Sequence, residues 1–121
     1  MLAYPQMKRS LALVLALLAL PAAPAAPAAP QGAFSVTIAA KDMHEECMHL
    51  AKGEKRNYSW RADGPVDFNI HYHSGGQASY PVRRDAMRGD GGTFVARADE
   101  DYCWMWSARD KPAKVDGRIS K

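Results

Sequence analysis

The five residues Tyr102–Trp106 constrain the fold most, because they hold one of the chain's two cysteines and two of its three tryptophans. Large aromatic side chains dominate the burial energy of a small domain. A cysteine among them can add a covalent cross-link to a neighbouring element. We therefore expect this stretch to form a central strand of the fold.

The N-terminus has the organisation of an export signal. Lys8 and Arg9 precede an uninterrupted apolar run over residues 11–20, and an Ala/Pro-rich tract follows. A basic start, a short apolar region and small residues after it are typical of a secretory signal peptide. The apolar run is shorter than the ~20 residues that a membrane-spanning helix needs. We predict a signal peptide and Ala/Pro-rich tract over residues 1–30, one domain over residues 31–121, and a periplasmic or secreted protein with no membrane span in the mature chain.

The two cysteines, Cys47 and Cys103, predict one disulfide, because paired cysteines in exported proteins are normally oxidised. The bond would close a loop of about 57 residues, which the chain-entropy model values at ~4 kcal/mol against the unfolded state. We expect reduction to destabilise the domain strongly, because small domains have only a narrow margin of stability.

The net charge argues against nucleic acid as a partner. The chain has 16 basic and 13 acidic residues, but Lys8 and Arg9 belong to the predicted signal. Without them 14 basic residues face 13 acidic ones, a net charge of +1. No stripe of Lys and Arg remains of the kind that binds a phosphate backbone.

Alternating apolar and polar residues predict β structure through the domain. In the clearest strand, Val66 to Tyr72, the apolar side chains share one face, and His71 and His73 lie on the other. Further strands are expected over residues 34–39, 47–50, 58–62, 78–82, 93–97, 102–106 and 113–119. Turn signals separate these strands at roughly ten-residue intervals, which is typical of an antiparallel sandwich. We predict an all-β fold, a small antiparallel β-sandwich of seven or eight strands with one inter-strand disulfide.

One segment of this pattern is ambiguous. Residues 41–51 fit a helical stripe or a strand. We favour a strand over Cys47–Leu50, because an all-β neighbourhood leaves little for a single amphipathic helix to pack against.

Several segments together resemble a known family. They are Cys47, the turn around Gly53, the strand Val66–His71, the segment Gly92–Ala96 and the stretch Tyr102–Ser107, and their order and spacing resemble the lumenal GOLD (Golgi dynamics) domain. The resemblance implies a β-sandwich whose disulfide joins an early strand to a late aromatic strand, and a non-catalytic module that binds proteins or lipids. Cargo receptors of that family continue into a coiled coil and a membrane span. We expect here a stand-alone exported member without these parts and without a cargo-sorting role.

Alternation also divides the aromatic stretch between two faces. If Cys103 and Met105 point into the core to reach Cys47, then Tyr102, Trp104 and Trp106 point away from it. Exposed tryptophans on a sheet usually mark a binding surface. The alternative is that a loop or terminal strand covers them, or that both faces of a central strand are buried. Our candidate ligand-binding residues are Tyr102, Trp104 and Trp106, with His71 and His73 at their polar margin.

Histidine and methionine side chains give a second hypothesis, a copper site in a periplasmic metal-binding protein. Its candidate ligands are His44, Met48, His49, His71 and His73. A disulfide would remove both cysteines as thiolate ligands, which disfavours zinc.

The sequence has no motif of a common enzyme class. It lacks the Gly-x-Ser-x-Gly elbow, a phosphate-binding loop and the His-Glu-x-x-His pattern. We therefore predict a non-catalytic binding module, without a cofactor, that recognises an unidentified protein or a small hydrophobic or aromatic ligand through its aromatic strand.

Overall fold

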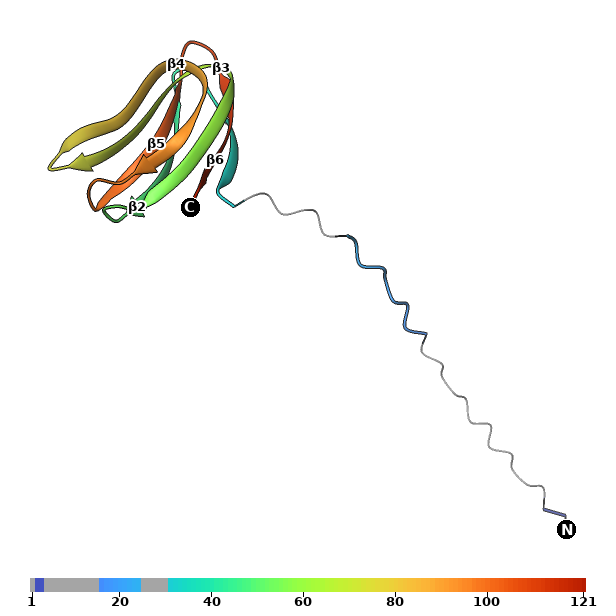
Figure 1. Ribbon diagram of the computed structural model, residues 1–121. Helices are drawn as coiled ribbons and strands as arrows, with labels where there is room; N and C mark the ends of the chain where they lie inside the picture. Colours follow the sequence, from blue (N-terminus) through green and yellow to red (C-terminus); the bar gives the residue numbers. More distant parts are fainter. Residues whose placement is uncertain (1, 4–15, 25–30) are drawn as a thin grey trace.

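The computed structural model describes residues 2–3, 16–24 and 31–121. Six strands form within these residues (Figure 1): β1 Ala33–Ile38, β2 Met43–Leu50, β3 Lys55–Ser74, β4 Gln77–Val95, β5 Glu100–Ala108 and β6 Ala113–Ser120. The described residues contain no helix long and apolar enough to cross a membrane. The predicted all-β class is confirmed, and so is a strand rather than a helix over Cys47–Leu50.

The number of strands is six, whereas seven or eight were predicted. Segments expected as separate strands are continuous in β3, which is 20 residues long, and in β4, which is 19. The sequence Asp63-Gly64-Pro65 is typical of a turn, but it remains extended within β3. The pairing with β4 shifts register between Arg61 and Val66. This break falls where Pro65 lacks a backbone N–H for the ladder.

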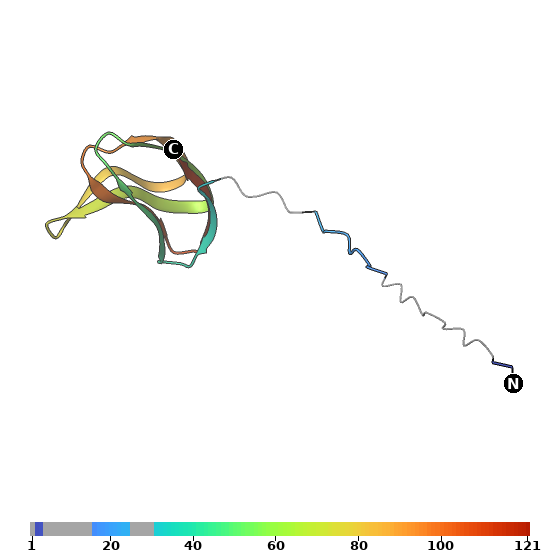
Figure 2. The same cartoon turned by 90° about the horizontal axis from the view of Figure 1, so that it is seen from below.

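All six strands belong to one antiparallel sheet, in the order β1-β6-β3-β5-β2, with β4 paired to the other edge of β3. The long strand β3 has two partners along one edge. Its residues Asn57–Ala62 pair with β6, and Val66–His71 pair with β5. The sheet curls, as the view from below shows (Figure 2), and the change of partner along β3 accompanies this curl. β5 lies between β3 and β2, so the prediction of a central aromatic strand is confirmed.

The hairpin of β3 and β4 projects from the body of the domain (Figure 1). Its tip is Gly75-Gly76, and both glycines have positive φ, 58° and 78°. A two-residue turn with positive φ at both positions matches the twist of the flanking strands, and glycine adopts it without strain.

The curl closes the sheet around one hydrophobic core. Trp60 and Phe68 of β3 meet Trp106 of β5, with ring centroids 5.3–6.3 Å apart. The two ends of the sheet also approach each other, because the Phe34 ring of β1 lies 5.8 Å from the His44 ring of β2 and 4.8 Å from Trp106. Edge-to-face and tilted aromatic pairs of this kind add ~0.5–1.5 kcal/mol each beyond their buried area.

The predicted orientation of the aromatic strand is wrong. Tyr102, Trp104 and Trp106 are 1%, 0% and 1% exposed and lie in the core, whereas Cys103 and Met105 are half-buried on the outer face. The predicted alternation along the strand is correct, but the side chains expected in the core lie on the outer face and those expected outside lie in the core. Three large rings gain more from burial than a cysteine and a methionine do. The predicted disulfide Cys47–Cys103 is present and needs no place in the core, because the two residues face each other directly across β2 and β5.

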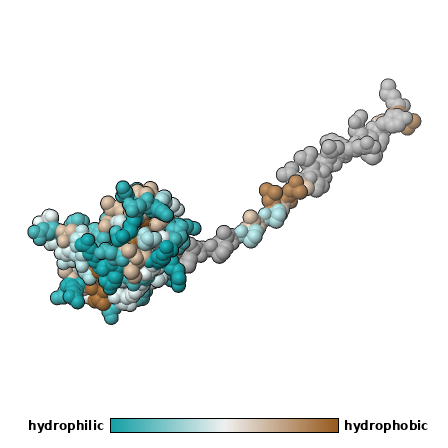
Figure 3. Space-filling view, turned by 90° about the horizontal axis from the view of Figure 1, so that it is seen from above, coloured by the Kyte–Doolittle hydropathy of each residue, from teal (hydrophilic) through white to brown (hydrophobic). Residues whose placement is uncertain are grey.

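The signal-peptide prediction falls largely on residues 1, 4–15 and 25–30, outside the described part of the chain. In residues 16–20, Leu17, Leu18 and Leu20 are almost fully exposed, and Figure 3 shows this apolar segment apart from the domain. On the face of the domain seen in that view, polar residues predominate. Both the signal peptide and the domain boundaries stay predictions.

Candidate functional site

A groove of about 560 Å³ runs beside β4. Volumes of this order are typical of small-molecule sites. We call it the β4 groove, and its lining residues are Tyr72, Ser79, Tyr80, Pro81, Val82, Thr93, Phe94, Val95, Arg97, Ala98 and Tyr102.

Both ends of β4 contribute to this groove. Val82 pairs with Ile70 near the end of β3, and Val95 pairs with Lys55 at its beginning. In a straight strand Val82 and Thr93 would be ~36 Å apart by the strand rise. They can line the same groove only because the β3–β4 hairpin bends with the sheet, at the register shifts that interrupt its pairing.

The back wall of the groove is aromatic and held in place. The Tyr102 ring lies 5.3 Å from Tyr72 and 5.0 Å from Phe94, and its hydroxyl donates a hydrogen bond of 3.0 Å to the carbonyl oxygen of Ala98. Tyr102 is only 1% exposed, so it supports the wall from behind and presents almost no surface.

The rim of the groove is where apolar surface reaches solvent. Within residues 31–121, the exposed large hydrophobic side chains are Met43, Tyr80 and Val95, and the last two line this groove at 46% and 43% exposure. Arg97 is the one charged residue among the lining residues, and it is exposed. The surface therefore suits a neutral or anionic group with an apolar or aromatic body.

A bulge sets the position of Tyr80. Ile70 pairs with Val82 and Tyr72 pairs with Ser79, so Tyr80 and Pro81 together lie opposite the single residue His71. Bulges of this kind turn a side chain out of its regular position. The Tyr80 ring lies 5.7 Å from the His71 ring, and the Arg83 guanidinium stands 5.4 Å from the Tyr80 ring centre.

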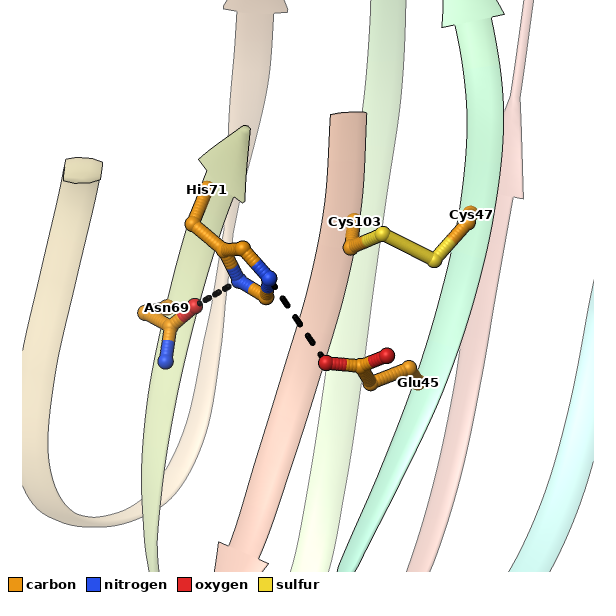
Figure 4. Close-up of a disulfide and its surroundings, with 5 residues drawn as sticks. All are labelled: Glu45, Cys47, Asn69, His71 and Cys103. Carbon is orange, nitrogen blue, oxygen red and sulfur yellow. Dashed lines mark hydrogen bonds and ion pairs between the residues drawn. A yellow bond between two sulfur atoms is a disulfide. The ribbon is translucent and has the colours of Figure 1, made fainter. Parts of the chain in front are cut away.

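A second feature, the outer-face cluster, consists of Glu45, Cys47, Asn69, His71 and Cys103 on β2, β3 and β5 (Figure 4). The His71 ring is 4% exposed and lies between two side chains. Its Nδ1–H donates to Asn69 Oδ1 at 2.7 Å, and its Nε2 is 3.6 Å from Glu45 Oε1. Burial lowers the pKa of His71 below its usual value, and the nearby Glu45 carboxylate offsets part of that shift.

The histidines and methionine predicted as copper ligands do not come together. His44 hydrogen-bonds Glu46 at 3.0 Å, and His49 hydrogen-bonds Asp101 at 2.8 Å on the opposite face of β2. Met48 is half-buried against the core, away from the outer-face cluster. Of the five, only His71 and His73 are close, with ring centroids 5.2 Å apart.

One group of potential metal ligands does gather within the described residues. Glu45, Cys47 and Cys103 place one ligand atom each within 4.8 Å of one another. In the oxidised protein the two sulfurs are bonded to each other, so this group is a disulfide with a carboxylate beside it and not a metal site.

Sequence reasoning found the disulfide and His71 but missed most of the groove. The sequence pattern places Tyr80 in a different segment from Val95 and Arg97. No local feature of the sequence indicates that these residues lie close together in the fold. The one local signal is Pro81, because a proline within a strand favours an edge position, and β4 pairs with β3 alone among the described strands.

Comparisons with known proteins give a fold and no family. No family model matches the sequence, and no curated protein matches it. The pre-peptidase C-terminal domain of a collagenase from Bacillus anthracis is similar in structure, with a TM-score of 0.56, 11% identity, and coverage of 73% of this chain and 87% of that one. A mitogen from Yersinia pseudotuberculosis is similar with a TM-score of 0.52, 11% identity, and coverage of 73% and 82%. At this identity the likeness concerns the fold alone.

Proposed function

We propose that the protein is a non-catalytic, exported binding module that holds a small apolar or aromatic ligand in the β4 groove. The observation that carries the proposal is that two of the three exposed large hydrophobic residues of the domain, Tyr80 and Val95, line the same groove. Exposed apolar surface that gathers in a concave site is typical of ligand binding.

The chemistry of the lining narrows the class of ligand. The lining includes ring and branched side chains such as Tyr80, Val82 and Val95, and Ser79 and Thr93 can exchange hydrogen bonds with polar groups of a ligand. Arg97 can pair with a carboxylate or sulfonate. A flat aromatic acid combines these properties.

The finer architecture in this proposal is a GOLD-like β-sandwich. In its support, β6 with β1 and β5 with β2 extend from different halves of β3, and Trp60 and Trp106 pack across the interior at 6.3 Å. The disulfide links an early strand to the aromatic strand, as the family resemblance implies. A disulfide is also compatible with an exported protein, because such bonds persist in oxidising compartments.

The proposal is tested with 1-anilinonaphthalene-8-sulfonate, a probe with an aromatic body and one negative charge. Titration of the purified oxidised protein should give saturable 1:1 binding. Tyr80→Ala should weaken it about tenfold, the equivalent of ~1.4 kcal/mol, because the exposed ring is a major contact. Arg97→Gln should weaken it less, by about threefold, as expected for an exposed charge.

Met43→Ala is the matched control, because Met43 is 58% exposed but lies outside the groove. Binding should be unchanged in this variant. If Met43→Ala weakens binding as much as Tyr80→Ala, or if neither variant changes it, the probe binds elsewhere and the β4 groove is not the site.

A further inference from the structure

The disulfide lies in surroundings that a purely structural cross-link does not require. Cys47 is exposed and Cys103 is half-buried, and both side chains project from the outer face of the sheet. The core packs against the opposite face of the same strands. A carboxylate and a buried imidazole stand beside the two sulfurs (Figure 4).

Three of these groups have their potential ligand atoms close together, and the fourth, His71, lies beside one of them. One oxygen of Glu45 and the two sulfurs lie within 4.8 Å of one another, and Nε2 of His71 is 3.6 Å from a Glu45 oxygen. Zinc binds sulfur at ~2.3 Å and nitrogen or oxygen at ~2.0–2.2 Å, so its tetrahedral ligands are separated by roughly 3.3–3.8 Å. The separation of His71 from Glu45 is already in this range, whereas the two sulfurs must move apart after reduction and the His71 ring, which lies outside the group of three, must approach them.

His71 is already oriented as a ligand. Its Nδ1–H donates to Asn69 Oδ1 at 2.7 Å, which leaves the Nε2 lone pair directed toward Glu45. Metal-binding histidines typically donate their other ring N–H to a carbonyl or carboxylate oxygen in this way, which fixes the tautomer and the ring plane. Two acceptors, Nε2 and a carboxylate oxygen, therefore face each other across a gap that a cation would fill favourably.

We propose that reduction of the Cys47–Cys103 disulfide converts the outer-face cluster into a zinc site, with Cys47, Cys103, Glu45 and His71 as ligands. A dithiol reductant supplies two electrons and two protons. The sulfur–sulfur bond breaks, two thiols form, and the reductant becomes a disulfide. Zinc then displaces the two thiol protons and binds both thiolates. In the oxidised protein no thiolate exists, so zinc binding depends on the redox state.

The sulfurs remain neighbours after the bond is cut, because other contacts hold β2 beside β5. The two strands pair in continuous register from Met43 with Ser107 to Leu50 with Glu100. Beneath the cysteines, the buried side chains of Tyr102 and Trp104 anchor β5 to the core. Zinc bridging the same two positions would restore the cross-link that reduction removes, and so would stabilise the reduced fold.

The experiment compares the oxidised full-length protein with protein reduced anaerobically by a phosphine. Zinc is titrated in competition with a chromophoric chelator, and Co²⁺ serves as a spectroscopic substitute. We expect one zinc per reduced molecule, no binding to the oxidised protein, and Co²⁺ spectra with thiolate charge-transfer and tetrahedral d–d bands. Zinc should also raise the melting temperature of the reduced protein.

Variants separate this site from a bare dithiol. His71→Gln and Glu45→Gln should each weaken zinc binding at least tenfold, and Asn69→Ala about tenfold through the orientation of His71. His44→Gln is the matched control, because His44 lies on the opposite face of β2. The zinc affinity of this variant should equal that of the wild type.

Three results would overturn the proposal. One is equal zinc affinity in wild type, His71→Gln and Glu45→Gln. Another is equal binding by the oxidised and reduced proteins. The third is a reduced protein that is unfolded and stays unfolded when zinc is added, whereas refolding on addition of zinc supports the site.

Discussion

The two faces of β5 differ in burial and in chemistry. On the inner face, Tyr102, Trp104 and Trp106 are almost completely buried. On the outer face, Cys103 bonds to Cys47 beside a buried histidine and a carboxylate, and Met105 is half-buried. The side chains of the inner face pack in the hydrophobic core, whereas the outer face holds the disulfide and its polar neighbours. One strand therefore serves both, and substitutions on its two faces should have effects of different kinds.

The largest expected effect is on the inner face. Trp104→Ala removes a 0% exposed indole that packs against Phe94 and Tyr58, and it should lower the free energy of unfolding by about 5 kcal/mol, the upper end for such truncations. Met105 is the next residue and lies half-buried on the outer face, so Met105→Ala should lower the free energy of unfolding by only about 1 kcal/mol. Urea denaturation measures both.

If Trp104→Ala does not fold, Trp104→Leu provides a smaller cavity for the same comparison. Equal losses for Trp104→Leu and Met105→Ala would contradict the division of β5 into a packed face and an accessible one.

The disulfide should have the next largest effect. Cys47→Ala combined with Cys103→Ala opens a loop with a sequence separation of 56 residues. The double variant should lose ~4 kcal/mol through the greater entropy of its unfolded state, with a similar native structure. Denaturation under oxidising conditions measures the loss. A double variant as stable as wild type would show that the disulfide adds nothing to stability.

His71 should give the outer face a pH dependence. Burial holds the pKa of His71 below its usual value of 6.5, so near that pH the unfolded state binds a proton that the folded state does not. Stability should therefore be full above pH 6.5, fall as the pH drops below it, and level off below the folded-state pKa.

His71→Gln tests this dependence. The variant should lose about 1 kcal/mol at pH 8, because the hydrogen bond to Asn69 is disturbed. It should also lack the decline that His71 causes between pH 6.5 and lower pH, so the difference from wild type should shrink on acidification. A wild-type slope that persists unchanged in the variant would assign the pH dependence to other groups.

The smallest effect concerns an exposed ion pair on β3. Asp67 accepts hydrogen bonds from Arg109 at 2.8 and 3.0 Å and from the backbone N–H of Ala86, a residue with a positive φ of 53°. Partial burial raises the pKa of Asp67, but these donors outweigh it and leave the pKa below 3.8. The stabilisation is thus present above pH 3.8 and lost as the pH falls through the folded-state pKa.

Asp67→Asn should cost less than ~1 kcal/mol at pH 7, because solvent screens the pair. Arg109→Gln should cost a similar amount, since it removes the same pair. Chemical denaturation of both variants checks this, and a loss comparable to that of Trp104→Ala would contradict the low weight given to exposed contacts.

Much of the fold was predictable from the sequence because the relevant signals are local. Alternation located the strands, and the oxidised pair Cys47–Cys103 followed from their number and the predicted export. The sequence prediction assigned the two faces of β5 the wrong way round, because alternation separates the side chains into two faces but does not indicate which face is buried. That choice depends on which side chains gain most from burial, a property of the whole sheet.

The β4 groove and the continuity of β3 were beyond local reasoning for another reason. Gly64-Pro65 reads as a turn in isolation, and only pairing with β4, β5 and β6 keeps it extended. The groove then depends on the bend of that hairpin, which brings together Tyr80 and Val95 from opposite ends of β4. Long-range geometry of this kind has no counterpart in a short window of sequence.

The disulfide lies at one end of the sheet. In the strand order, β2 is a terminal strand whose pairing partner is β5, and Cys47 fastens it there. Terminal strands are the elements that two molecules most readily exchange or join edge to edge. A covalent bond between β2 and β5 prevents β2 from leaving for a second molecule. The oxidised protein is thereby protected against domain swapping through β2, and that protection ends when the bond is reduced.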